Sequence, residues 1–197
     1  MTMKWMKKWS SLLAALVLCL MSVSATAGGW EIPGGSSGSS GGYTCRVKLV
    51  EDLATRCGPG TQYAGCGSFK MRGQTVTAMS RAYDRGGVLW VEIEFSTGKG
   101  YRRAWTGAKR LDISKSQLSR LPDGDPTYSL GYGTITGWVQ PRMGPGTLYA
   151  AYPNDDFYSG TAVAVLRSEG GYYMVERYRS NGDILRCWVP SGMLRMN

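Results

Sequence analysis

The chain has 197 residues, with 23 Lys and Arg against 14 Asp and Glu, and it contains no histidine. This length suits one or two small domains. The lack of an imidazole argues against Ser–His–Asp and Cys–His catalysis, in which histidine takes the proton. Acidic pairs occur at Glu92/Glu94 and Asp155/Asp156, but such close neighbours are typical of solvated surface. We therefore expect a non-catalytic protein.

Residues 1–27 have the pattern of a secretory signal peptide. Three lysines precede Leu12–Leu20, an apolar run that is too short to span a membrane as a helix, and Ala25–Ala27 offers small residues for cleavage. We expect a mature chain that is secreted or associated with the cell envelope and has no transmembrane segment. An uncleaved membrane anchor is the alternative.

Residues 28–42 form the next segment, in which Gly34–Gly42 contains only Gly and Ser. This composition is typical of a flexible linker, because it offers no side chains to bury. We interpret it as a tether that precedes the folded part of the chain.

An eight-residue motif occurs twice. Arg56–Tyr63 (Arg-Cys-Gly-Pro-Gly-Thr-Gln-Tyr) returns 86 positions later as Arg142–Tyr149 (Arg-Met-Gly-Pro-Gly-Thr-Leu-Tyr), with six of eight residues identical. Gly-Pro-Gly predicts a tight turn in which the second glycine takes a positive φ. An ordinary turn explains the glycines and the proline, but it requires neither the Arg nor the Tyr.

The repeat extends over residues 43–113 and 128–197. Runs of alternating, β-branched residues follow each motif in the same order and predict strands. The matched runs are 73–79 with 160–166, 90–94 with 172–176, and 103–105 with 186–188. The connection at 114–127 has the composition of a loop, with one helical turn expected at Ser116–Leu121. It is short, so we expect the two lobes to touch.

This succession resembles the bacterial SH3-like (SH3b) domain family. The family runs from a first strand through Leu-Asn-Val-Arg-x-Gly-Pro, a glycine-led strand and Trp-x-x-Val to a closing Gly-Trp-Val. Leu53–Pro59 and Val139–Pro145 match the second of these motifs, although Ala54 and Gln140 replace its Asn and the closing motifs lack their glycine. The resemblance implies an all-β fold of two tandem small SH3-like β-barrels.

The resemblance also implies recognition of cell-wall peptidoglycan or its peptide stems in an aromatic-lined groove. Aromatic rings suit sugars and peptides, and a tyrosine adds a hydrogen bond. The candidate ligand-binding residues are Tyr63, Trp90, Tyr101, Tyr149, Tyr158 and Tyr172.

Charge is distributed unevenly between the two copies. Residues 43–113 carry 12 basic and 6 acidic residues, whereas residues 128–197 carry 6 and 5. A basic surface attracts anionic partners such as anionic wall polymers, while nucleic acid is a poor candidate for an exported protein. We expect the first copy to dominate wall binding. An ordinary soluble surface is one alternative, and an extracytoplasmic protein–protein interaction or adaptor module is the other.

The segment Trp90–Phe95 alternates in character. Val91, Ile93 and Phe95 share one face, which we assign to the core, and Trp90 falls on the other face beside two carboxylates. A bulge that turns Trp90 into the core is the alternative.

Four cysteines follow the predicted leader, and an exported chain with four can form two disulfides. Cys57 and Cys66 are replaced together in the second copy and flank a turn, so we favour a Cys57–Cys66 bond, which leaves Cys45 and Cys187 as the second pair. The alternative is that Cys57 and Cys187 are buried thiols. We expect no metal or other cofactor, because Cys-x-x-Cys and histidine are absent.

Overall fold

The computed structural model describes residues 42–124 and 129–197. The predicted signal peptide, the linker up to residue 41 and residues 125–128 of the connection lie outside the described residues. Below, the first lobe is residues 43–113 and the second lobe is residues 129–197. The described residues of both lobes belong to one compact unit.

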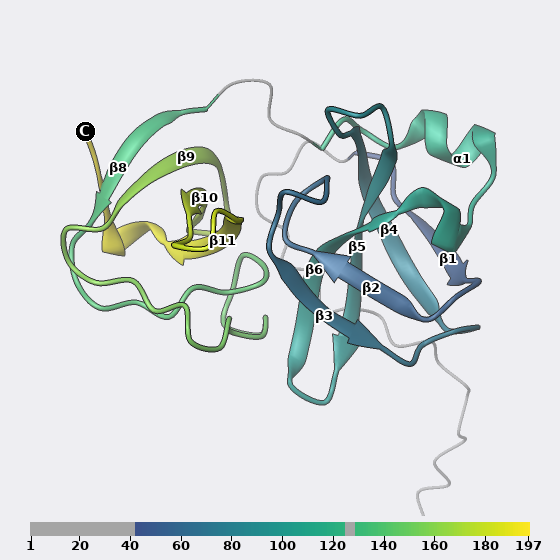
Figure 1. Cartoon of the computed structure of the whole chain (residues 1–197), viewed down its shortest axis with the longest axis horizontal. Helices are drawn as coiled ribbons and strands as arrows, with labels where there is room; N and C mark the ends of the chain where they lie inside the picture. Colours follow the sequence, from purple (N-terminus) through teal and green to yellow (C-terminus); the bar gives the residue numbers. More distant parts are fainter. Residues whose placement is uncertain (1–41, 125–128) are drawn as a thin grey trace, which may run out of the picture. The chain divides into compact units, whose positions relative to one another are not determined.

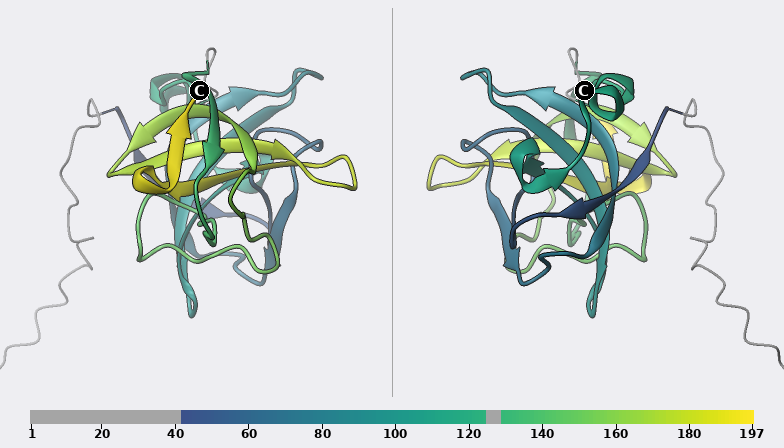
Figure 2. Two further views of the ribbon diagram at one scale, coloured as in Figure 1. Left: turned by 90° about the vertical axis from the view of Figure 1, so that its left-hand side faces the viewer. Right: turned by 90° about the vertical axis from the view of Figure 1, so that its right-hand side faces the viewer.

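The first lobe is a curled, antiparallel sheet of seven strands in the order β3-β2-β6-β5-β4-β1-β7 (Figure 1). The long strands β4 and β5 bend along their length (Figure 2). The strands are β1 (Cys45–Leu49), β2 (Leu53–Arg56), β3 (Gly65–Phe69), β4 (Thr75–Tyr83), β5 (Leu89–Thr97), β6 (Gly100–Gly107) and β7 (Leu111–Asp112).

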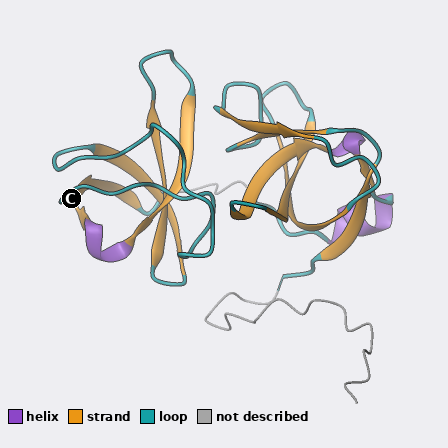
Figure 3. Ribbon diagram, turned by 90° about the horizontal axis from the view of Figure 1, so that it is seen from below, coloured by secondary structure: helices purple, strands orange, loops and turns teal. Residues whose placement is uncertain are grey.

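The second lobe is an antiparallel sheet of five strands in the order β11-β10-β9-β8-β12. Its strands are β8 (Gly131–Ile135), β9 (Ala162–Glu169), β10 (Tyr172–Tyr178), β11 (Ile184–Pro190) and β12 (Leu194–Met196). Helix is confined to short turns in the described residues (Figure 3). These are η1 (Ala108–Arg110), α1 (Lys115–Arg120) and η2 (Ser191–Met193).

The internal repeat is visible in the strand order. Five strands of the first sheet, β6-β5-β4-β1-β7, have the same order as β11-β10-β9-β8-β12 of the second. A 3-10 turn precedes the last strand in both lobes. The all-β prediction is therefore confirmed, as is the helical turn of the connection, which is capped by Ser114 and Gln117.

The main core contains Val91, Ile93 and Phe95 of β5, as their alternation predicts. Trp90 lies on the opposite face of β5, and the irregularity of the β4–β5 ladder falls in β4 between Ala78 and Ser80, not at the tryptophan. Trp90 is nevertheless buried, because it packs in a separate cluster of Ala82, Trp90 and Trp105.

Candidate ligand-binding cleft

The repeated motif forms the same turn in both lobes. Gly60 and Gly146 have φ values of 137° and 156°, which favour glycine, as predicted. The first glycine of each motif lies under the motif tyrosine. A Cβ added to Gly58 would come within 2.3 Å of the Tyr63 ring, and one added to Gly144 within 2.0 Å of the Tyr149 ring. The tyrosine therefore explains why that position is glycine.

The motif arginine closes the same turn. Arg56 donates from Nη1 to the carbonyl oxygen of Tyr63 at 2.6 Å. Arg142 donates in the same way to the carbonyl oxygen of Tyr149 at 2.8 Å. Both arginines thus donate to backbone acceptors of the turn and hold it closed.

The two motifs also join the lobes, because each forms backbone hydrogen bonds with a strand of the other lobe. Ala64 donates its amide to the Ile184 carbonyl at 2.9 Å, and the Ile184 amide donates to Gln62 at 3.0 Å. In the reverse direction, Tyr101 donates to Leu148 at 3.1 Å, and Ala150 donates to Tyr101 at 2.8 Å. The expectation that the lobes touch is confirmed, and the contacts are reciprocal, as around an approximate two-fold axis.

Each motif tyrosine enters a Glu–Arg pair of the other lobe. The Tyr149 hydroxyl donates to Glu94 Oε2 at 2.5 Å, and Arg103 donates from Nε to the same oxygen at 2.8 Å. Arg103 also donates from Nη1 to Glu169 Oε1 at 2.8 Å. Burial opposes a charge on Arg103, but Tyr149 and the two carboxylates outweigh it and raise its pKa. We call Tyr149, Arg103 and Glu94 the first clamp.

The second clamp consists of Tyr63, Arg186 and Glu176, which occupy the equivalent positions. Arg186 donates from Nη2 to the Tyr63 hydroxyl at 2.9 Å and from Nε to Glu176 Oε1 at 2.7 Å. In both lobes the Glu and the Arg are directly paired across adjacent strands. Arg103 and Arg186 also lie over the rings of the tyrosines that they hold, at 5.4 and 4.8 Å from the ring centroids.

The prediction that Glu92 and Glu94 are solvated is wrong. Their exposed fractions are 4% and 9%. Glu92 accepts from the Ser80 hydroxyl at 2.8 Å and pairs with Arg167 of the second lobe at 3.5 Å. Contacts with another lobe, which alternation along one strand cannot reveal, account for the burial.

The predicted disulfides are not formed, and the four cysteines of the described residues are free thiols. Cys57 and Cys66 are neighbours, but they are not disulfide-bonded to each other. The Cys66 thiol also contacts the Tyr152 hydroxyl at 3.4 Å, and Tyr152 is the residue 86 positions later in the repeat. Cys66 and Tyr152 occupy equivalent positions and face each other across one shared space. Only one of the two side chains can be large, which gives a packing reason why one copy has cysteine and the other tyrosine.

These thiols differ in their acidity. Burial raises the pKa of Cys66, and the neighbouring Cys57 thiol adds to that effect. Burial also opposes ionisation of Cys57, but hydrogen bonds from Cys66 and the Arg186 amide outweigh it and lower the Cys57 pKa. Burial raises the pKa of Cys187, so it stays neutral at ordinary pH.

The six aromatic candidates are not gathered in one groove. Tyr63, Tyr101 and Tyr149 lie at the contact between the lobes, where the rings of Tyr101 and Tyr149 are 6.2 Å apart. Tyr172 is half-buried against Leu166, Met174 and Trp188, and Tyr158 is exposed on the second lobe. Trp90 lines a cleft on the first lobe.

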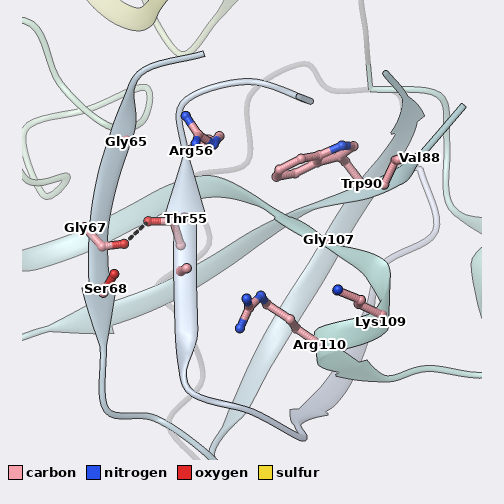
Figure 4. A pocket seen from close by; sticks show the side chains of 11 residues that line it. Thr55, Arg56, Gly65, Gly67, Ser68, Val88, Trp90, Gly107, Lys109 and Arg110 are labelled. Atoms are coloured by element: carbon pink, nitrogen blue, oxygen red, sulfur yellow. Dashed lines mark hydrogen bonds between the residues drawn. The ribbon is translucent and has the colours of Figure 1, made fainter. Parts of the chain in front are cut away.

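This cleft has a volume of about 620 Å³ and is formed by segments that lie far apart in the sequence. Strand β2 contributes Thr55 and Arg56, β3 contributes glycines and Ser68, and β5 contributes Trp90. The end of β6 and η1 contribute Gly107, Lys109 and Arg110. In Figure 4, Arg56 and Trp90 lie toward one end of the cleft and the two other cations toward the opposite end. The volume lies within the range of small-ligand sites.

The cleft combines a fixed aromatic ring with three cations. The Trp90 indole donates from Nε1 to Asp84 Oδ2 at 3.0 Å, and this hydrogen bond lowers the pKa of Asp84. Arg110 donates to Glu51 Oε2 at 2.9 Å, so this carboxylate partly neutralises its charge. Lys109 is exposed, and among the described residues it has no hydrogen-bond or ion-pair partner. The site can therefore receive an anionic group beside an apolar ring.

Sequence reasoning identified Trp90 but missed the cations of the cleft. Lys109 and Arg110 are more than 50 positions from Arg56, and only the pairing of β2 with β6 brings them together. The excess positive charge of the first lobe was the available signal, although it could not show where the charges gather.

Comparison of the chain with models of protein families, with curated proteins and with solved structures finds no match. Among the described residues, no helix has the length and apolar character needed to cross a membrane. In the same part of the chain, no three side chains of the metal-binding types His, Cys, Asp and Glu are grouped.

Proposed function

We propose that the protein is an exported, non-catalytic binding module that recognises cell-wall peptidoglycan or an associated anionic envelope polymer. The observation that carries the proposal is the cleft of the first lobe, which Trp90 lines together with Arg56, Lys109 and Arg110. A carboxylate or phosphate of the polymer would meet these cations, while an apolar part of it packs on the indole.

The second lobe supports this assignment by contrast. Its equivalents of Lys109 and Arg110 are Gly192 and Met193, which occupy the same place in η2. The turn therefore forms without these cations. Arg110 also donates to Glu51 and to the Asp52 carbonyl of its own lobe, whereas Lys109 makes no such contact among the described residues and has no evident part in folding. A contact with an anionic ligand would give Lys109 a role.

We further propose that each lobe is a small SH3-like barrel of the bacterial type. The motif joins β2 to β3 in the first lobe, β4 follows shortly after Gly73, and Trp90 is the second residue of β5. The second lobe repeats the order with β9 and β10. Strand order and the doubled motif support this reading.

Retention on purified cell walls tests the function. The chain lacking residues 1–27 is mixed with purified peptidoglycan, once with its anionic polymers attached and once stripped of them. We expect retention that weakens with added salt, because salt screens exposed charges. The variant Lys109→Gln/Arg110→Gln should bind roughly tenfold more weakly, a loss of about 1.4 kcal/mol.

The matched control is Arg46→Gln/Lys48→Gln, which removes the same charge from exposed positions of β1 outside the cleft. It should bind like the native chain. Equal losses in the two variants would show a diffuse charge effect and contradict a role for the cleft. Failure of the native chain to bind either preparation would contradict the function and favour an extracytoplasmic protein–protein module.

A further inference from the structure

The second lobe exposes two aromatic side chains at one cross-strand position. Val139 and Phe157 exchange both backbone hydrogen bonds, each at 2.9 Å, and their side chains are buried. An antiparallel register places Trp138 opposite Tyr158 on the other face. Their exposed fractions are 60% and 62%.

A hydrogen bond fixes the indole on that face. Trp138 donates from Nε1 to Asp156 Oδ2 at 3.2 Å. Asp156 is two residues before Tyr158 and so lies on the same side of the segment. The bond leaves the faces of the indole available, and it places a carboxylate at the edge of the aromatic pair.

The first lobe shows that folding does not require this aromatic pair. Its equivalent of the Val139–Phe157 pair is Leu53–Phe69 at the start of the β2–β3 ladder. The flanking positions there are Asp52 and Lys70, which approach each other at 3.9 Å. An ion pair thus occupies the place that Trp138 and Tyr158 occupy in the second lobe.

We propose that Trp138 and Tyr158 form a stacking platform for a pyranose ring of a neutral, hydroxyl-rich glycan. The apolar face of a sugar ring packs on exposed aromatic faces, and a sugar hydroxyl would donate to Asp156 Oδ2 at the edge, since Oδ1 of this carboxylate is buried. That negative charge disfavours an anionic polymer here, in contrast to the cationic cleft of the first lobe. The inference does not depend on the function proposed for the cleft.

Titration with neutral oligosaccharides tests the platform. Short, soluble oligomers of β-1,4-linked N-acetylglucosamine and of β-1,4-linked glucose are added to the chain lacking residues 1–27, and binding is followed by tryptophan fluorescence and calorimetry. We expect binding of at least one series. The variant Trp138→Asp/Tyr158→Lys carries the pair of the first lobe and should bind roughly tenfold more weakly or not at all.

Two further variants keep the test decisive. Trp138→Ala should lose binding with an unchanged thermal unfolding midpoint, which separates loss of the platform from loss of the fold. The cleft variant Lys109→Gln/Arg110→Gln should bind the oligosaccharides like the native chain, so the cleft and the platform can fail independently.

Three results would overturn the proposal. One is that the native chain binds neither series. Another is that the Trp138→Asp/Tyr158→Lys variant binds as tightly as the native chain. The third is that sedimentation shows a homodimer that this variant dissolves, because a second copy would then be the occupant of the aromatic surface.

Discussion

The two lobes share one set of residues that join them and differ in several residues that face outward. The motif glycines, the motif tyrosines and the Glu–Arg pairs occur in both copies and meet at the contact between the lobes. In contrast, Lys109 and Arg110 of the first lobe correspond to Gly192 and Met193, and Trp138 of the second lobe corresponds to Asp52.

This comparison assigns two kinds of role. A residue that recurs because each lobe holds the other is structural, however conspicuous it is in the sequence. A residue that differs at an equivalent, exposed position is not needed to join the lobes, and it is the better candidate for ligand binding. The doubled motif, which first suggests a ligand site, therefore serves mainly to join the two lobes.

The strongest test of the shared residues is the close packing of glycine under tyrosine. Gly58→Ala and Gly144→Ala should each lower the unfolding free energy by about 3 kcal/mol, because the new Cβ would overlap the ring of the motif tyrosine. Chemical denaturation measures the effect.

Gly192→Ala is the control, since a Cβ there meets no atom within 4 Å, and it should change stability by no more than about 0.5 kcal/mol. A large loss at Gly144 with none at Gly58 would break the equivalence of the two motifs. Similar small changes at all three positions would contradict the packing itself.

A smaller effect is expected from the buried thiol of Cys187, whose counterpart in the first lobe is Ala104. Burial raises the folded pKa of Cys187, so its contribution to stability is full below the pKa of the unfolded thiol, about 8.5, and falls as pH rises above it. Cys187→Ala should therefore lose less stability than the native chain between neutral and alkaline pH.

Unfolding curves measured across that pH range for both proteins check this expectation. The two curves should diverge only above the pKa of the unfolded thiol. Parallel curves throughout the range would show that Cys187 is not held in its neutral form.

Local rules predicted much of the fold. The positive φ of Gly60 and Gly146 follows from turn chemistry, and the core face of β5 follows from alternation. The burial of Glu92 and Glu94 did not follow, because it arises from the second lobe and not from their own strand. The joint replacement of Cys57 and Cys66 in the second copy suggested a disulfide, but the cysteines are free, and Tyr152, the counterpart of Cys66, contacts the Cys66 thiol.

Less of the candidate site than of the fold could be predicted from the sequence. Charge imbalance singled out the first lobe, and Trp90, one of the predicted ligand-binding residues, lines its cleft. The cations of the cleft come from β2 and η1, which are separated in the chain, and Trp138 carried no signal beyond being one of seven tryptophans. Only comparison of equivalent positions in the folded lobes distinguishes these residues.

The exchange of tyrosines between the lobes is the central claim, and a double-mutant cycle tests it most directly. Tyr149→Phe and Glu94→Ala, which lie in different lobes, are made singly and together, and the unfolding free energies are measured. The account predicts a coupling of about 1–2 kcal/mol for this pair. It predicts additivity within about 0.5 kcal/mol for Tyr149→Phe with Glu176→Ala, the same residue type in the other clamp. Additivity of Tyr149→Phe with Glu94→Ala would contradict it.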